Sequence, residues 1–130
     1  MKKSIMLALV ALFIGLLAGC ASVPNNCNLT GTWKYTFEES GKDETQTGLM
    51  TLTQDQYTLK GKANDAFGEF NLTGSNIAGT PNISIEGVRI DNKRTFNFSG
   101  KLTTENEFEG TYTTNQNTSG TLEANRVIPQ

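Results

Sequence analysis

From residue 29 onward, apolar and polar side chains alternate with a period of two. Trp33, Tyr35 and Phe37 share one parity with polar residues between them, and Phe96 and Phe98 repeat the pattern. Successive side chains of a strand point to opposite faces, so this alternation predicts strands with one buried and one solvated face. No stretch has a convincing helical period, and we therefore expect an all-β domain.

Turn-forming residues divide this region into eight predicted strands. They span residues 30–38, 47–54, 56–63, 68–73, 82–90, 94–102, 106–114 and 118–127. Connectors this short favour antiparallel neighbours in an up-and-down meander. The alternation changes phase at Gly87, where we expect a β-bulge.

Glycine follows an apolar residue by two positions at Gly31, Gly61, Gly74, Gly100 and Gly110. A glycine inside a strand costs about 0.5–1 kcal/mol relative to alanine, so this repetition calls for a geometric reason. Tight coiling or close approach of two backbones supplies one. Eight short strands with such sites predict a closed antiparallel β-barrel, which leaves no exposed edge. A β-sandwich is the alternative.

The first twenty residues follow a different pattern. Met1-Lys2-Lys3 precedes an apolar run of 15 residues, 5–19, that ends at Cys20. This run is shorter than the roughly 20 residues of a membrane-spanning helix and fits a secretory signal peptide. Leu17-Ala18-Gly19-Cys20 closely resembles the lipobox of bacterial lipoproteins. The resemblance implies cleavage before Cys20, a diacylglycerol on its thiol and acylation, such as by palmitate, of the new amine.

This resemblance predicts a signal peptide at 1–19, a lipidated flexible tether at 20–28 and a barrel domain at 29–130. Three acyl chains would anchor the protein to a membrane essentially permanently. Ala21 follows the cysteine, which in such lipoproteins implies delivery to the outer membrane of a cell that has one. The tether would reach about 25–30 Å at roughly 3.3–3.6 Å per residue. A plain signal peptide with a chance cysteine is the alternative.

Charge and composition narrow the chemistry of the mature chain. Removal of Lys2 and Lys3 leaves nine basic and thirteen acidic residues, a formal charge of −4, so nucleic acid is not an expected partner. The chain has no histidine, which excludes Ser-His and Cys-His catalysis and histidine-containing zinc sites. We expect no enzyme, cofactor or metal. Lipidation of Cys20 would leave Cys27 without an intramolecular disulfide partner, so we expect Cys27 to be buried or inert.

Gly31-Thr32-Trp33 opens the first predicted strand, and Arg126 ends the last. This pair resembles the signature of lipocalins, avidins and related calycin-type barrels. The resemblance implies that the tryptophan closes one barrel end while the basic side chain covers its ring, a structural role for both. The strings 27–33, 107–112 and 124–127 look avidin-like. The chain has no second tryptophan to contact biotin, so the resemblance implies the fold and not biotin binding.

An eight-stranded barrel is just wide enough to be filled by side chains or to hold one small ligand. The sixteen large inward candidates are Trp33, Tyr35, Phe37, Met50, Leu52, Tyr57, Leu59, Phe70, Leu72, Ile83, Ile85, Phe96, Phe98, Phe108, Tyr112 and Leu122. This number favours a filled or shallow barrel. The mouth of any pocket should lie opposite Trp33, with Tyr35, Tyr57 and Tyr112 as polar contacts for a ligand.

Two functions follow from these observations. The first is a non-catalytic, lipocalin-like envelope lipoprotein that binds a small hydrophobic ligand in its lumen. The second is an envelope protein–protein interaction module with a filled barrel, either structural or similar to the small-barrel bacterial inhibitors of secreted metalloproteases.

Overall fold

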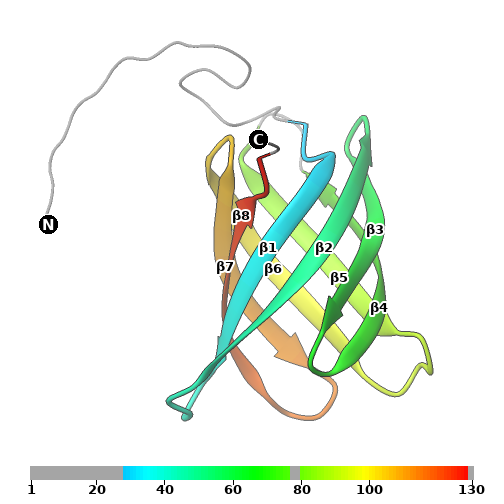
Figure 1. Cartoon of the computed structure of the whole chain (residues 1–130). Helices are drawn as coiled ribbons and strands as arrows, with labels where there is room; N and C mark the ends of the chain where they lie inside the picture. The colour runs from blue at the N-terminus through cyan, green and yellow to red at the C-terminus, as the bar shows by residue number, and fades with distance from the viewer. Residues whose placement is uncertain (1–27, 77–79, 129–130) are drawn as a thin grey trace, which may run out of the picture.

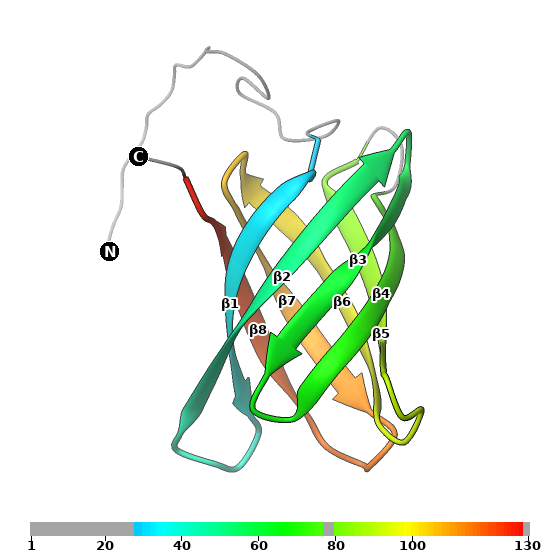
Figure 2. The ribbon, with the colours of Figure 1, turned by 45° about the vertical axis from the view of Figure 1, so that its right-hand side comes forward.

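Eight antiparallel strands form one closed sheet (Figures 1 and 2). The computed structural model describes residues 28–76 and 80–128. The strands are β1 (Gly31–Glu39), β2 (Thr45–Asp55), β3 (Thr58–Asp65), β4 (Gly68–Asn76), β5 (Asn82–Arg89), β6 (Thr95–Thr104), β7 (Glu107–Thr114) and β8 (Ser119–Arg126). The predicted eight-stranded meander barrel is confirmed, and the sandwich alternative is excluded. Within the described ranges, no helix has the length and apolarity needed to cross a bilayer.

The seam of the barrel is the pairing of the first strand with the last. Trp33 lies opposite Arg126, and Phe37 lies opposite Leu122, in an antiparallel register that runs to Glu39. Every strand therefore has two hydrogen-bonded neighbours, and the sheet has no free edge to template aggregation.

The alternation read from the sequence separates the lumen from the outer wall. Fourteen of the sixteen predicted inward side chains are buried and Phe96 is half-buried, whereas Tyr57 is 52% exposed. The assignment of Tyr57 to the lumen was wrong because β2 extends to Asp55 and β3 begins only at Thr58. Tyr57 therefore lies in the connecting turn, beyond the end of the sheet, although it has the inward parity.

The predicted bulge at Gly87 was also wrong. Gly87 stays in register, opposite Leu72 on β4 and Phe96 on β6. It occupies an inward position without a side chain, and the Phe96 ring fills that space: a Cβ on Gly87 would lie 2.2 Å from Phe96 Cε2. The irregularity lies instead in β6, where the register with β7 shifts between Leu102 and Thr104.

Two of the repeated glycines mark close contacts between neighbouring backbones. A Cβ on Gly61 would lie 1.8 Å from the carbonyl oxygen of Thr51, and one on Gly110 would lie 2.1 Å from that of Ser99. Neither carbonyl can move without breaking the strand pairing around it. Close approach of backbones is therefore the reason for glycine at these positions.

The indole of Trp33 plugs the end of the barrel at which β1 begins and β8 ends, hereafter the closed end. Trp33 and Leu29 have no exposed surface. Trp33 Nε1 donates a hydrogen bond to the Leu29 carbonyl oxygen at 2.9 Å, and the ring packs on Phe108 at 4.8 Å between centroids. The Leu29 amide in turn donates to Gln54 Oε1 at 2.9 Å. The one polar atom of the plug is thus satisfied inside an apolar end.

Arg126 covers this plug from the outside, with its guanidinium carbon 4.5 Å from the centroid of the Trp33 ring. Its nitrogens donate to four oxygens: Thr30 O (2.9 Å), Asn28 O (3.0 Å), Glu105 O (3.0 Å) and Asn106 Oδ1 (3.1 Å). Gly31 gives the guanidinium room, because a Cβ there would lie 3.1 Å from Arg126 Nη1 and the residue has φ +146°. Arg126 therefore joins the start of β1, the β6–β7 turn and the indole.

We predict that Arg126→Ala lowers the free energy of unfolding by about 2–4 kcal/mol, because the indole loses its cation and three backbone carbonyls lose a charged donor. Arg126→Lys should restore less than half of this loss, since an ammonium group lacks the planar fork of donors. Urea unfolding followed by Trp33 fluorescence measures the free energy of unfolding of both variants. Lys60→Ala, at an exposed position of β3, is the matched control and should change stability by less than about 0.5 kcal/mol. A loss for Arg126→Ala no larger than that of the control would contradict this role.

Candidate functional site

A small cavity lies at the end of the barrel opposite Trp33, hereafter the mouth. This end carries the β1–β2, β3–β4, β5–β6 and β7–β8 turns (Figure 1). The cavity has a volume of about 30 Å³ and is lined by Tyr35, Phe37, Asp65, Phe67, Phe70, Arg94, Phe96, Tyr112, Thr114 and Leu122. Its position agrees with the prediction that a pocket would open opposite Trp33. Its volume, enough for one or two water molecules, agrees with a filled or shallow barrel.

Aromatic rings form most of the cavity wall. Phe37 on β1 contacts Tyr112 on β7 edge-on at 5.7 Å between centroids and Phe67 of the β3–β4 turn at 6.0 Å. On the opposite side, Phe70 packs edge-on against Phe96 at 5.3 Å. Aromatic pairs favour these edge-on and offset geometries, so the rings of the wall could make similar contacts with a flat, apolar ligand.

Tyr35 and Asp65 form the main polar feature of the wall. The Tyr35 hydroxyl donates to Asp65 Oδ2 at 2.5 Å, and Asp65 Oδ1 accepts from the Phe67 amide at 2.8 Å. Gly48 lies opposite Tyr35 on β2, and a Cβ there would lie 2.7 Å from the tyrosine hydroxyl. The missing side chain lets the phenol cross β2 and reach β3.

Burial raises the pKa of Tyr35 well above its ordinary value, and the hydrogen bond to Asp65 and the charge of that carboxylate raise it further. The hydroxyl therefore stays protonated and serves as a fixed donor to Asp65. Burial likewise raises the pKa of Tyr112, with a contribution from Glu39 that Arg94 opposes. Both tyrosines are neutral around physiological pH.

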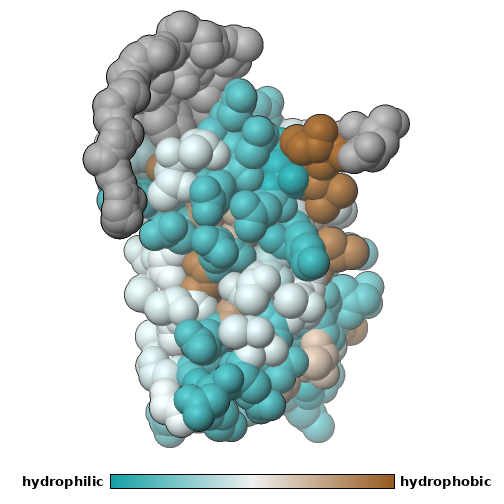
Figure 3. All heavy atoms as spheres, turned by 60° about the vertical axis from the view of Figure 1, so that its left-hand side comes forward, coloured by the Kyte–Doolittle hydropathy of each residue, from teal (hydrophilic) through white to brown (hydrophobic). Residues whose placement is uncertain are grey.

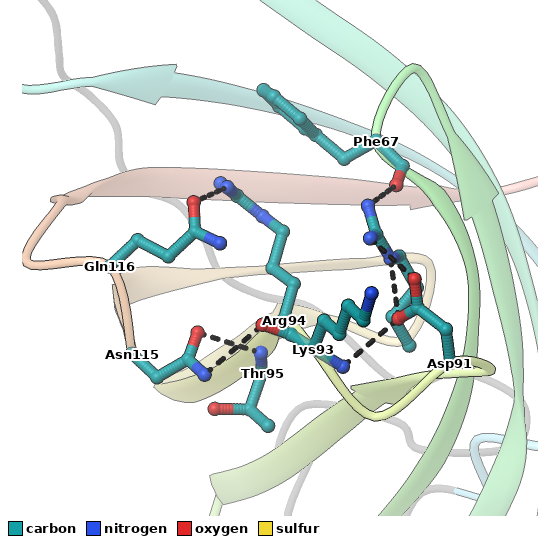
Figure 4. A network of polar contacts seen from close by, with 8 residues as sticks. Phe67, Asp91, Lys93, Arg94, Thr95, Asn115 and Gln116 are labelled. Atoms are coloured by element: carbon teal, nitrogen blue, oxygen red, sulfur yellow. Dashed lines mark hydrogen bonds and ion pairs between the residues drawn. The ribbon is translucent and has the colours of Figure 1, made fainter.

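Arg94 and Phe67 cover the cavity from the rim, and we call this pair the lid. The guanidinium carbon of Arg94 lies 4.1 Å from the centroid of the Phe67 ring, and Nη1 donates to Gln116 Oε1 at 2.9 Å (Figure 4). Arg94 comes from the β5–β6 turn and Gln116 from the β7–β8 turn. The lid thus joins three of the four turns at the mouth through side chains alone.

A second arginine holds the backbone beneath the lid. Arg89 forms a bidentate pair with Asp91, at 2.9 Å and 2.6 Å, and donates from Nη1 to the Phe67 carbonyl oxygen at 3.0 Å (Figure 4). The Arg89 hydrogen bond lowers the pKa of Asp91 to about 2, helped by the Lys93 amide. The carboxylate therefore stays charged, and the β3–β4 and β5–β6 turns remain tied together.

Of the predicted ligand-contacting residues, the structure brings Tyr35 and Tyr112 together at the mouth and leaves Tyr57 at the other end. Cys20 and Cys27 lie outside the described residues. The sequence reasoning missed Asp65, Phe67 and Arg94, which belong to turns or strand ends. One signal for the missed residues was present in the sequence. Phe67 is a large aromatic residue between two predicted strands, where the alternation assigned it no place in the core.

Three carboxylates gather on the outer wall. Glu107 and Glu109 of β7 and Glu123 of β8 bring one oxygen each within 4.8 Å of the others. A hydrogen bond to Glu107 is the largest cause of the raised pKa of Glu123, followed by burial and by repulsion from its neighbours. This cluster lies on the outer wall, separate from the lumen.

No protein-family model matches the chain, and no curated protein matches it. Solved structures do share its fold. A redesigned β-barrel, b11L5F_LGL, is 17% identical and has a TM-score of 0.67 over 82% of this chain and 98% of its own. A de novo designed fluorescence-activating β-barrel is 14% identical, with a TM-score of 0.61 over 81% and 99%. The redesigned barrel mFAP1, bound to DFHBI, is 17% identical, with a TM-score of 0.58 over 75% and 94%. At these identities the likeness establishes a small β-barrel fold.

We predict that the stability of the protein falls above pH 10 and that Tyr35 causes part of the fall. The unfolded tyrosine loses its proton near pH 10 while the folded Tyr35 keeps it, so Tyr35 lowers the free energy of unfolding by about 1.4 kcal/mol per pH unit above that value. Urea unfolding between pH 8 and pH 11 measures the slope. The free energy of unfolding of Tyr35→Phe should fall less steeply with pH, because Tyr112 still contributes to the slope and Tyr35 no longer does. Identical slopes for the two proteins would contradict the assignment.

Proposed function

We propose that this protein is a membrane-anchored bacterial envelope lipoprotein whose non-catalytic barrel binds a small, flat hydrophobic ligand at the mouth. The observation that carries the binding role is the aromatic cavity beneath the Arg94–Phe67 lid, with the Tyr35–Asp65 pair in its wall. Apolar walls with a few converging polar groups are the usual composition of a small-molecule site.

The lid is the part of the site that would have to move. A cavity of about 30 Å³ holds water and not an organic ligand. The ligand must therefore displace the Phe67 ring and occupy its position under Arg94. Phe67 and Arg94 lie in or beside turns, where side chains can leave without disturbing a strand pair. A flat aromatic guest would recover the cation–π contact that Phe67 gives up.

The similar designed barrels support this use of the fold. Two redesigned β-barrels of similar fold, mFAP1 and mFAP0, are bound to DFHBI, so a small β-barrel of this kind can hold a small ligand. The chain lacks histidine, which removes the commonest general base and nucleophile activator and supports a binding role rather than an enzymatic one.

The second candidate function is a protein–protein interaction module of the envelope. The small volume of the cavity favours it, because a filled barrel leaves only the outer walls and turns for recognition. Binding of small molecules distinguishes the two candidates.

We expect Phe67→Ala to bind the aromatic probe anilinonaphthalene sulfonate at least fivefold more tightly than the unchanged protein, because the guest no longer has to displace a ring. Fluorescence titration of residues 20–130 carrying Cys20→Ser measures the affinity, and native mass spectrometry tests palmitic acid and protoporphyrin IX alongside. Ile90→Ala, at an exposed position of the neighbouring turn, is the matched control and should leave binding unchanged. If neither protein binds any of the three probes, the interaction function replaces the ligand-binding one.

We expect the full chain, produced in a bacterial host with radioactive palmitate, to carry the label and to sediment with membranes. Cys20→Ala should lose the label, because the thiol that accepts diacylglycerol is gone and cleavage at the lipobox fails. Cys27→Ala is the matched control and should keep it. Label on Cys20→Ala equal to that on the unchanged chain would exclude lipidation at this cysteine.

A further inference from the structure

The exposed hydrophobic side chains of the described residues are concentrated at the closed end. Five large ones are exposed, and three of them lie here: Tyr57 (52%), Val127 (45%) and Ile128 (55%). Figure 3 shows a strongly hydrophobic patch of the surface at this end of the molecule. Of the other two, Leu49 lies on the outer wall and Ile90 lies at the mouth. We call Tyr57, Val127 and Ile128 the apolar rim.

Backbone hydrogen bonds hold both parts of the rim, although Tyr57 precedes Val127 by about seventy positions. The carbonyl oxygen of Tyr57 accepts from the Asn76 amide at 2.9 Å, which ties the β2–β3 turn to the end of β4. The Val127 amide donates to Thr32 O at 2.8 Å, which extends the β8–β1 pairing by one residue. The backbones of Tyr57 and Val127 are therefore fixed at the closed end.

The chain enters the barrel at this same end. Arg126 Nη2 donates to the Asn28 carbonyl oxygen at 3.0 Å, so the first described residue is held against the closed end. Cys20 precedes Asn28 by eight residues, a contour of at most about 25–30 Å. If Cys20 carries lipid, as proposed above, the barrel cannot move farther than this from the bilayer surface.

We propose that the closed end rests on the membrane, with the apolar rim in the interface between headgroups and acyl chains and the mouth facing away. This inference rests on the proposed lipidation. Tyrosine favours this interface because its ring is apolar and its hydroxyl stays wet, and branched aliphatic side chains gain from leaving water. The contact can be weak and still persist, because the tether keeps the rim at a high effective concentration near the lipid.

The charges at this end indicate an apolar contact rather than attraction to anionic lipid. The guanidinium of Arg126 is committed to four oxygens and the Trp33 ring. Asp55 and Glu105 lie in or beside the turns of the same end, where the exposed Lys60 and Lys101 of the adjoining strands balance their charge. The contact should therefore be nearly independent of salt concentration, whereas binding through basic residues weakens as salt rises.

The test uses the full lipidated chain in vesicles of phosphatidylcholine and the anionic phosphatidylglycerol that also contain a lipid with a nitroxide quencher near the headgroup. Tyr57→Trp reports on the closed end, and Ile90→Trp, equally exposed at the mouth, is the matched control. The unchanged chain, whose Trp33 is buried, supplies the background to subtract. We expect quenching of the Tyr57→Trp reporter to be at least threefold stronger than that of Ile90→Trp, with no loss between 50 mM and 500 mM salt.

Equal quenching of the two reporters on protein that carries lipid and sediments with the vesicles would overturn the orientation while leaving the anchoring in place. Absence of lipid at Cys20, measured by the mass of the purified chain, would overturn both. If Tyr57→Trp does not fold, as judged by circular dichroism, Ile128→Trp reports on the same end, and the same threefold difference from Ile90→Trp decides the outcome.

Discussion

The barrel depends on the closure of its sheet between β1 and β8, and Arg126 joins that seam to the core. Its position opposite Trp33 brings the guanidinium over the indole and within reach of backbone carbonyls on two other segments. One side chain thus holds the entry of the chain, the β6–β7 turn and the plug of the lumen. Closure also protects the sheet, because an open eight-stranded meander would present two unpaired edges.

The two ends of the lumen are packed differently, and glycine positions contribute to the difference. At the closed end, Trp33 fills the space between the strands, with its polar atom bonded to Leu29. Towards the mouth, Gly48 leaves room that the Tyr35 phenol occupies, and Gly87 is covered by the Phe96 ring. Large rings over missing side chains fill most of the lumen and leave a small cavity beneath side chains that come from turns.

Period-two alternation carried most of the fold information, because burial on one face of a strand constrains every second residue. Trp33 and Arg126 could be placed from their positions in the first and last strands. Tyr57 could not, because parity says which face a residue would take and not where the sheet ends. The lid was missed for a related reason: Arg94 and Phe67 lie in or next to turns, where no periodicity records which side chains fold back over the lumen. Anchoring through Cys20 still rests on the sequence pattern alone.

The Tyr35–Asp65 hydrogen bond affects the width of the barrel. It runs from β1 to β3 across Gly48, which has no side chain, so it links two strands that are not neighbours in the sheet. This hydrogen bond opposes widening of the barrel, because β1 and β3 cannot separate without leaving the buried Tyr35 hydroxyl without a hydrogen-bond partner. Entry of the proposed ligand would then depend on movement of the turns at the mouth, because the hydrogen bond fixes the width of the barrel between β1 and β3.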